Sequence, residues 1–140
     1  MKRILIPVDG SENALRAVEY GITAASGCAS AEVHLLNIQE PIYDQVRDVM
    51  TQPEVERMEI ETGKYILEKA KKILDDAGIP NVMEVRIGPV APKIADYARE
   101  MKCDNIIMGT RGMGSIKTLI MGSVTTKVIH LADVPVTLVK

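Results

Sequence analysis

The sequence predicts a single-domain α/β protein, built on a doubly wound, five-stranded parallel sheet with four helices over its two faces. The 140-residue chain has the usual length of one domain. Short apolar runs alternate along it with segments in which apolar residues recur at helical spacing. Strict alternation of this kind is typical of right-handed crossover units, in which helices cover both faces of a parallel sheet. We therefore expect one domain over residues 1–140.

Five short apolar runs are predicted to form the strands. Each run is bounded by turn-forming residues such as Gly, Pro, Asp or Asn, and each is too short for a helix of ordinary length. Continuous apolar runs suit strands that are buried on both faces of a sheet. The predicted strands cover residues 4–8, 33–38, 82–87, 105–108 and 134–139.

Four segments between these runs are predicted to be helices, because their apolar residues recur with a helical period. Asp9 or Ser11 can cap the first helix, while Gly78 and Pro80 end the second. Residues 41–53 show no sustained period and are predicted to form a loop or mobile flap. The predicted helices begin near Ser11, Glu54, Val90 and Ser123 and end near Ser26, Ala77, Met101 and Ala132.

Composition and charge exclude several classes of protein. The formal net charge is -2, the isoelectric point is near 5.7, and Lys and Arg form no dense cluster, so nucleic-acid binding is not expected. The first apolar run meets Pro7 and Asp9 too early for a signal peptide or a membrane span. We expect a cytoplasmic protein that does not associate with membranes. Cys28 and Cys103 stand far apart, which fits neither a disulfide framework nor a zinc site.

A glycine-rich segment follows the fourth predicted strand and reads Gly109-Thr110-Arg111-Gly112-Met113-Gly114-Ser115. Ligands of doubly wound sheets bind at the carboxyl ends of the strands, and glycines leave the backbone amides there accessible. Gly122-Ser123 opens the last predicted helix, where unpaired N–H groups and the helix dipole favour an anion. The two elements together predict a phosphate site. In the alternative interpretation, the glycines serve only tight turns and close packing, and Ser123 is an ordinary N-cap.

Two standard phosphate motifs do not fit the chain. A P-loop needs Lys directly after its second glycine, whereas Ser115 follows Gly114 and Lys117 comes later. A dinucleotide fingerprint needs a further glycine at position 117 and belongs after the first strand, where Gly10 is the only glycine. A phosphate would therefore be bound by a different glycine pattern.

The spacing Gly109-x2-Gly112-x9-Gly122-Ser123 matches the G-x2-G-x9-G-S/T pattern of ATP-binding universal stress proteins. The opening Ile4-Leu5-Ile6-Pro7-Val8-Asp9-Gly10-Ser11, the Gly88-Pro89 turn and the closing Val134-Pro135-Val136-Thr137-Leu138-Val139 also resemble that family, so the resemblance covers essentially the whole chain. It implies an adenine nucleotide alpha hydrolase-like fold with strand order 3-2-1-4-5. It also implies that ATP is the ligand, accompanied by Mg²⁺ or another divalent cation bound through the phosphates.

The resemblance implies a role for each residue that matches the family's site. Pro7, Val8 and Asp9 would lie beside adenine and ribose, with Asp9 orienting the nucleoside, and Ile38 and Met108 would form apolar walls. One departure is Asn37, at the end of the second predicted strand, where relatives often carry His. The residues along the ribose and phosphates would be Gly109, Arg111, Gly112, Gly122, Ser123, Val124 and Thr125.

No catalytic constellation is predicted. His34 lies inside the second predicted strand and His130 late in the last helix, so each is expected to be structural or exposed. The glutamates at positions 54, 56, 59 and 61 are expected to form a solvated helix face rather than a metal site. We expect at most slow ATP hydrolysis in a protein that acts as a nucleotide-dependent regulatory or stress-response switch.

Two other functions suit a fold of this kind. A phospho-acceptor signalling domain needs an acidic pair after the first strand and an acceptor Asp after the third, but Gly10 follows Asp9 and Gly88 follows Ile87. A dimeric interaction module of the same fold, without nucleotide binding, stays open. In the implied strand order the closing run lies at a sheet edge, and an apolar edge strand invites pairing with a second copy. We therefore expect a homodimer through residues 134–139, unless Pro135 and the terminal lysine blunt this edge.

Overall fold

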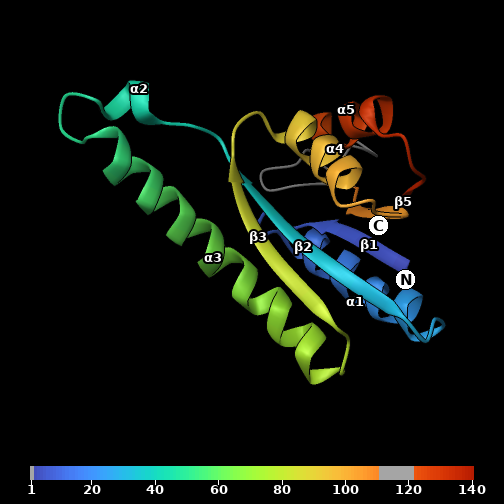
Figure 1. The fold of residues 1–140 in the computed structure, drawn as a ribbon. Coiled ribbons are helices and arrows are strands. Elements are labelled where there is room, and N and C mark those ends of the chain that lie inside the picture. Colours follow the sequence, from blue (N-terminus) through green and yellow to red (C-terminus); the bar gives the residue numbers. More distant parts are fainter. Residues whose placement is uncertain (1, 111–121) are drawn as a thin grey trace.

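The computed structural model describes residues 2–110 and 122–140, and it confirms the predicted parallel sheet. Five strands lie in the order β3-β2-β1-β4-β5 (Figure 1). All neighbouring strands are parallel, and the register sets Ile4 of β1 opposite Val33 of β2. The strands are β1 (Lys2–Pro7), β2 (Ala31–Gln39), β3 (Asn81–Ile87), β4 (Asn105–Gly109) and β5 (Val136–Val139).

Among the described residues, the four longer helices cover both faces of this sheet (Figure 1). Successive strand residues point to opposite faces, so Ile4 and Ile6 of β1 pack beneath one helical layer whereas Leu5 packs beneath the other. The predicted apolar runs follow from this arrangement, because the central strands are buried on both sides. One layer holds α1 (Glu12–Ser26) and α3 (Gln52–Asp76), and the other holds α4 (Val90–Glu100) and α5 (Ser123–Leu131).

The number of helices differs from the prediction, because the described part of the chain contains five rather than four. The additional helix, α2 (Tyr43–Val46), lies within the segment that the sequence predicts to be a loop or flap. It has four residues and none of them is buried, so it leaves no apolar period in the sequence. α3 follows at Gln52, where Thr51 Oγ1 accepts a hydrogen bond from Glu54 N at 3.3 Å as the N-cap.

Each strand also differs from its predicted run by one or two residues at one or both ends. β2 begins at Ala31 and ends at Gln39, so it extends beyond both ends of the predicted run. β5 begins at Val136 rather than at residue 134. Pro135 has no N–H to donate, and its carbonyl instead accepts from Ile106 N at 3.0 Å. None of the described helices combines the length and the apolar character that crossing a membrane requires.

Candidate functional site

The carboxyl ends of β1, β2 and β4 lie along one edge of the sheet, which is where ligands bind in this architecture. The structure brings the described members of the predicted site to this edge or to the adjoining start of α5. Arg111 and Gly112 lie outside the described residues. The described members are Pro7, Val8, Asp9, Ile38, Met108, Gly109, Gly122, Ser123, Val124 and Thr125.

Two side chains shape the loop after β1. Asp9 Oδ1 accepts from Ser11 N at 2.9 Å, and Ser11 Oγ accepts from Ala14 N at 3.1 Å. Ser11 is therefore the N-cap of α1, which decides between the two candidates that the sequence left open. Asp9 is exposed, so its carboxylate can accept further hydrogen bonds from the hydroxyl groups of a ligand.

Gly109 ends β4 at a point where the start of α1 passes very close. A Cβ atom at this position would lie 2.7 Å from Asn13 O and 2.8 Å from Asn13 Cβ. Because contacts this short are repulsive, any other residue would push α1 and β4 apart. Close packing therefore suffices to explain this glycine, and a role of Gly109 toward a phosphate stays a prediction.

α5 begins with no side-chain cap from the described residues. Its N-cap is Gly122, and the exposed Ser123 is the first helical residue rather than the ordinary N-cap of the alternative interpretation. The N–H groups of the first turn have no intrahelical acceptor and carry the positive end of the helix dipole. A Cβ atom added at Gly122 would meet no described atom within 4 Å. This helix start can therefore receive an anion.

Two hydrogen bonds hold the start of α5 beside the end of β4. Gly122 N donates to Thr110 O at 3.0 Å, and Thr125 Oγ1 donates to Gly109 O at 3.4 Å. Thr110 and Thr125 are both buried. The hydroxyl of Thr125 therefore anchors the helix to the strand, and it positions the first turn of α5 at the carboxyl edge.

The apolar members of the predicted site divide between the two faces of the sheet. Ile38 and Met108 pack against the core beneath α4 and α5, whereas Val8 packs against the core beneath α1 and α3. The side chain of Val8 is only 2% exposed. Its contribution to a ligand would consequently come from the backbone, while Ile38 keeps an accessible apolar surface.

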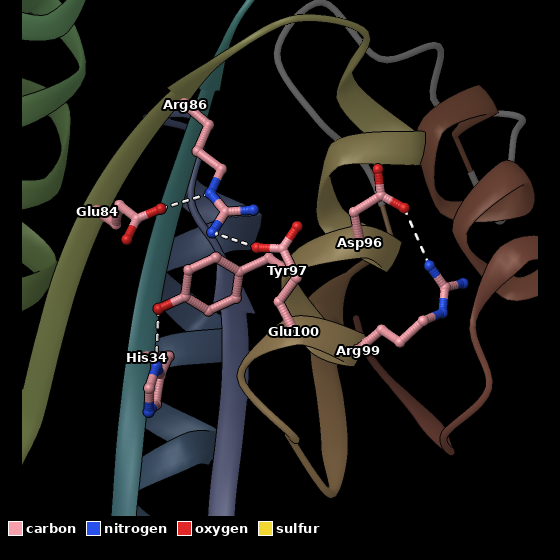
Figure 2. A network of polar contacts seen from close by, with 7 residues as sticks. All are labelled: His34, Glu84, Arg86, Asp96, Tyr97, Arg99 and Glu100. Atoms are coloured by element: carbon pink, nitrogen blue, oxygen red, sulfur yellow. Dashed lines mark hydrogen bonds and ion pairs between the residues drawn. The ribbon is translucent and has the colours of Figure 1, made fainter.

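The buried histidine lies in the middle of β2, opposite Leu5 and away from the carboxyl edge. His34 Nδ1 is 2.7 Å from Tyr97 Oη (Figure 2), and its Nε2 is 2.7 Å from Glu32 Oε1. Burial, assisted by the nearby Glu84 carboxylate, raises the pKa of Tyr97 to about 12. The phenol therefore stays protonated. Because the Glu32 carboxylate can only accept, Nε2–H donates to it, and the Tyr97 hydroxyl can donate to Nδ1. With both ring nitrogens engaged, His34 is structural, as predicted.

Arg86 of β3 packs over the same tyrosine. Its guanidinium carbon lies 4.7 Å from the centroid of the Tyr97 ring, and its Nη2 is 2.8 Å from Glu100 Oε2 (Figure 2). Burial alone lowers the pKa of Arg86, but hydrogen bonds to Glu84 and Glu100 raise it further than burial lowers it. The cluster thus joins β2, β3 and α4 through charge and packing.

No three His, Cys, Asp or Glu side chains within residues 2–110 and 122–140 are placed to hold a metal ion.

The prediction for one acidic residue of α3 is wrong. Glu59, expected on a solvated face, is 4% exposed, and its Oε1 accepts from Ile42 N at 3.0 Å. It therefore ties the chain between β2 and α2 to the long helix. The sequence contains the signal for this placement, because Glu59 lies four residues after Val55 and four before Gly63, which are both on the buried face.

Comparison with known proteins agrees with this fold. The family model described as the universal stress protein family matches residues 1–140. A universal stress protein of Thermus aquaticus, named for the QAH/OAS sulfhydrylase 3′ region, is 36% identical over 99% of this chain and 98% of its own length. The solved structure of MJ0577 of Methanocaldococcus jannaschii has a TM-score of 0.86 at 31% identity, over 99% of this chain and 95% of that chain. A universal stress protein of Archaeoglobus fulgidus, solved in complex with dAMP, has a TM-score of 0.72 at 20% identity, over 100% and 98% of the two chains.

Proposed function

The chain belongs to the universal stress protein family, and from that premise we propose that it binds ATP and acts as a nucleotide-dependent regulatory or stress-response switch. The observation that carries the proposal is the start of α5, which has no side-chain cap from the described residues and is held at the carboxyl end of β4. Backbone amides and a helix dipole in this position favour a phosphate group.

The nucleoside would lie toward the end of β1. Asp9 is exposed there, and its carboxylate can accept from ribose hydroxyls, while Ile38 offers an apolar surface to the purine. The relative solved with dAMP carries an adenine nucleotide. At 20% identity, likeness to that protein establishes the shared fold alone, so adenine enters here only as part of the proposal. Mg²⁺ or another divalent cation would accompany the triphosphate through its phosphate oxygens.

The proposed activity is binding rather than rapid hydrolysis. A general base must lie within hydrogen-bond reach of the attacking water. His34 is held in the middle of β2 by Tyr97 and Glu32, and His130 is exposed late in α5. Neither described histidine is therefore placed at the ends of β1 and β4, and we expect any turnover to be slow.

The direct test is to identify and titrate the nucleotide. Mass spectrometry of the supernatant after denaturation of the purified protein should detect an adenine nucleotide. Calorimetry on nucleotide-free protein should show saturable binding of Mg-ATP at one site per chain. If no nucleotide is recovered and Mg-ATP releases no heat of binding, the proposal fails.

A second candidate is a dimeric interaction module of the same fold that binds no nucleotide. This function is favoured by the edge strand β5, which pairs with β4 alone among the described strands. The side chain of Leu138 on this strand is 36% exposed. Such an edge has free backbone groups that a second copy can satisfy. Light scattering combined with calorimetry separates the two functions, because a stable dimer with no affinity for Mg-ATP would support the module and exclude the switch.

A further inference from the structure

Asn37 is a buried polar residue of β2 that touches the loop after β1. It is 3% exposed, and its Nδ2 donates to Val8 O at 2.8 Å. Its Oδ1 accepts from Gln39 Nε2 at 2.7 Å. The orientation of the amide follows from chemistry, because a carbonyl can only accept and the atom facing Val8 O must therefore be the nitrogen.

The bond to Val8 stands where the β1–β2 ladder would otherwise continue. Val8 N donates to Leu36 O at 2.8 Å, which places Val8 opposite Asn37. In a parallel ladder the next bond would run from the amide of Ile38 to Val8 O. The side chain of Asn37 supplies the donor to that carbonyl instead, and β1 ends at Pro7.

Close packing from α3 keeps Asn37 in this position. A Cβ atom at Gly63 would lie 2.8 Å from Asn37 Oδ1 and 2.5 Å from Val85 Cγ1. The backbone of α3 therefore approaches β2 and β3 so closely that only glycine fits. Together with the bond from Gln39, this contact leaves the amide of Asn37 little freedom to turn away from Val8.

We propose that Asn37 is a positioning residue for the nucleotide: it ends the β1–β2 ladder at Val8 and thereby fixes the backbone of Pro7–Val8–Asp9 at the carboxyl edge. The effect of Asn37 on nucleotide binding rests on the proposed function, whereas its effect on the backbone of the loop after β1 does not. Val8 has its side chain buried, so only its backbone and the following Asp9 can face a ligand, and Asn37 holds both through one carbonyl.

Hydrogen exchange in the ligand-free protein tests the structural step. Asn37→Leu keeps a similar volume but removes the donor, so the amides of Val8 and Ser11 should exchange about tenfold faster than in wild type. The amide of Lys2, which donates to Ser30 O at the far end of the ladder, should change little and serves as the internal reference. Val33→Ala is the matched control, because it opens a cavity in the same strand without touching Val8.

A second variant tests donation itself. Asn37→Asp has the same shape, and its ionised carboxylate cannot donate to Val8 O. Protection of the Val8 and Ser11 amides should be lost at neutral pH and should recover as the pH is lowered and the new carboxyl group takes up a proton. A purely steric role for Asn37 predicts no such recovery. Wild-type protection at neutral pH in both variants would overturn the proposal.

Binding measurements then separate this proposal from the proposed function. Asn37→Leu should raise the Kd for Mg-ATP about tenfold while leaving the Kd for inorganic tripolyphosphate unchanged, because the start of α5 is anchored independently of Asn37. Equal loss for both ligands, or no loss for ATP, would overturn the positioning role. If the wild type binds no adenine nucleotide, the proposed function fails, and hydrogen exchange still decides whether Asn37 fixes the loop.

Discussion

Replacement of Gly122 by Val should abolish ATP binding while leaving the fold intact. Gly122 has φ of -77° and ψ of 167°, which a β-branched residue adopts without strain, and a Cβ atom there would meet no described atom within 4 Å. Val is a poorer N-cap than Gly, so the free energy of unfolding should fall by no more than about 1 kcal/mol. The side chain would instead occupy the space through which a phosphate approaches the first turn of α5.

The expected loss of affinity follows from the interactions at that helix start. A charge-assisted hydrogen bond from a backbone amide contributes about 1.5–3 kcal/mol, and the helix dipole adds about 0.3–1 kcal/mol. Blocking two amides should therefore cost at least about 3 kcal/mol, which is about two orders of magnitude in Kd. Calorimetric titration with Mg-ATP measures this change, and circular dichroism melting checks the fold.

Gly27→Val provides the matched control. Gly27 is the C-cap of α1, at the opposite end of that helix from the site, and a Cβ atom there also meets no described atom within 4 Å. The same substitution at Gly27 should leave the Kd for Mg-ATP unchanged. If folded Gly122→Val binds Mg-ATP as tightly as wild type and the Gly27 control, then the start of α5 does not bind the phosphates.

Three further outcomes are expected. Asp9→Ala should raise the Kd for Mg-ATP by the equivalent of about 1–3 kcal/mol. The melting temperature should change little, because Asp9 is exposed and Ser11 caps α1. A collapse of the melting temperature in the absence of nucleotide would show that Asp9 is structural. The free energy of unfolding should fall by up to about 3 kcal/mol as the pH rises from about 10 to 12, because the folded state holds the Tyr97 proton more tightly than the unfolded state. Tyr97→Phe should remove the part of this pH dependence that is due to Tyr97. Burial also raises the pKa of Cys103 to about 11, so the part due to Cys103 should remain. An unchanged pH dependence in denaturant titrations of the variant would contradict the assignment. Leu138→Asp should convert a wild-type dimer into a monomer in light scattering, since Leu138 is exposed on the edge strand whereas Val136 packs against the core. A wild-type protein that is monomeric at micromolar concentration would contradict the proposed dimer.

The sheet could be predicted because its central strands are buried on both faces. Ile4, Leu5 and Ile6 are all fully buried although they point to opposite sides, and such runs are visible in the sequence as unbroken apolar stretches. The order of the strands could not be read from these runs and came from the resemblance. α2 was missed because a single exposed turn depends on neighbouring structure rather than on its own pattern.

Buried polar residues explain the remaining differences between sequence and structure. Polarity predicts exposure for Glu59, yet Ile42 N needs an acceptor inside the fold, and the carboxylate of Glu59 provides it. Asn37 is a second buried polar residue, for which the sequence offers no prediction of burial. It lies on the same face of β2 as Val33 and Leu35, and its amide donates a hydrogen bond to Val8 O. Which buried backbone group lacks a partner depends on the tertiary structure, so these placements cannot be read from the sequence.

The glycines of the predicted phosphate site differ in whether packing within the fold requires them. Gly109 is required by packing, because Asn13 leaves no room for a Cβ atom, and its substitution would disturb the fold whether or not a nucleotide binds. Gly122 has open space around it among the described residues and an ordinary backbone conformation, so packing there does not require glycine. A glycine that the fold does not need is the one whose substitution reports on the ligand, and for this reason Gly122 rather than Gly109 is the decisive position for testing phosphate binding.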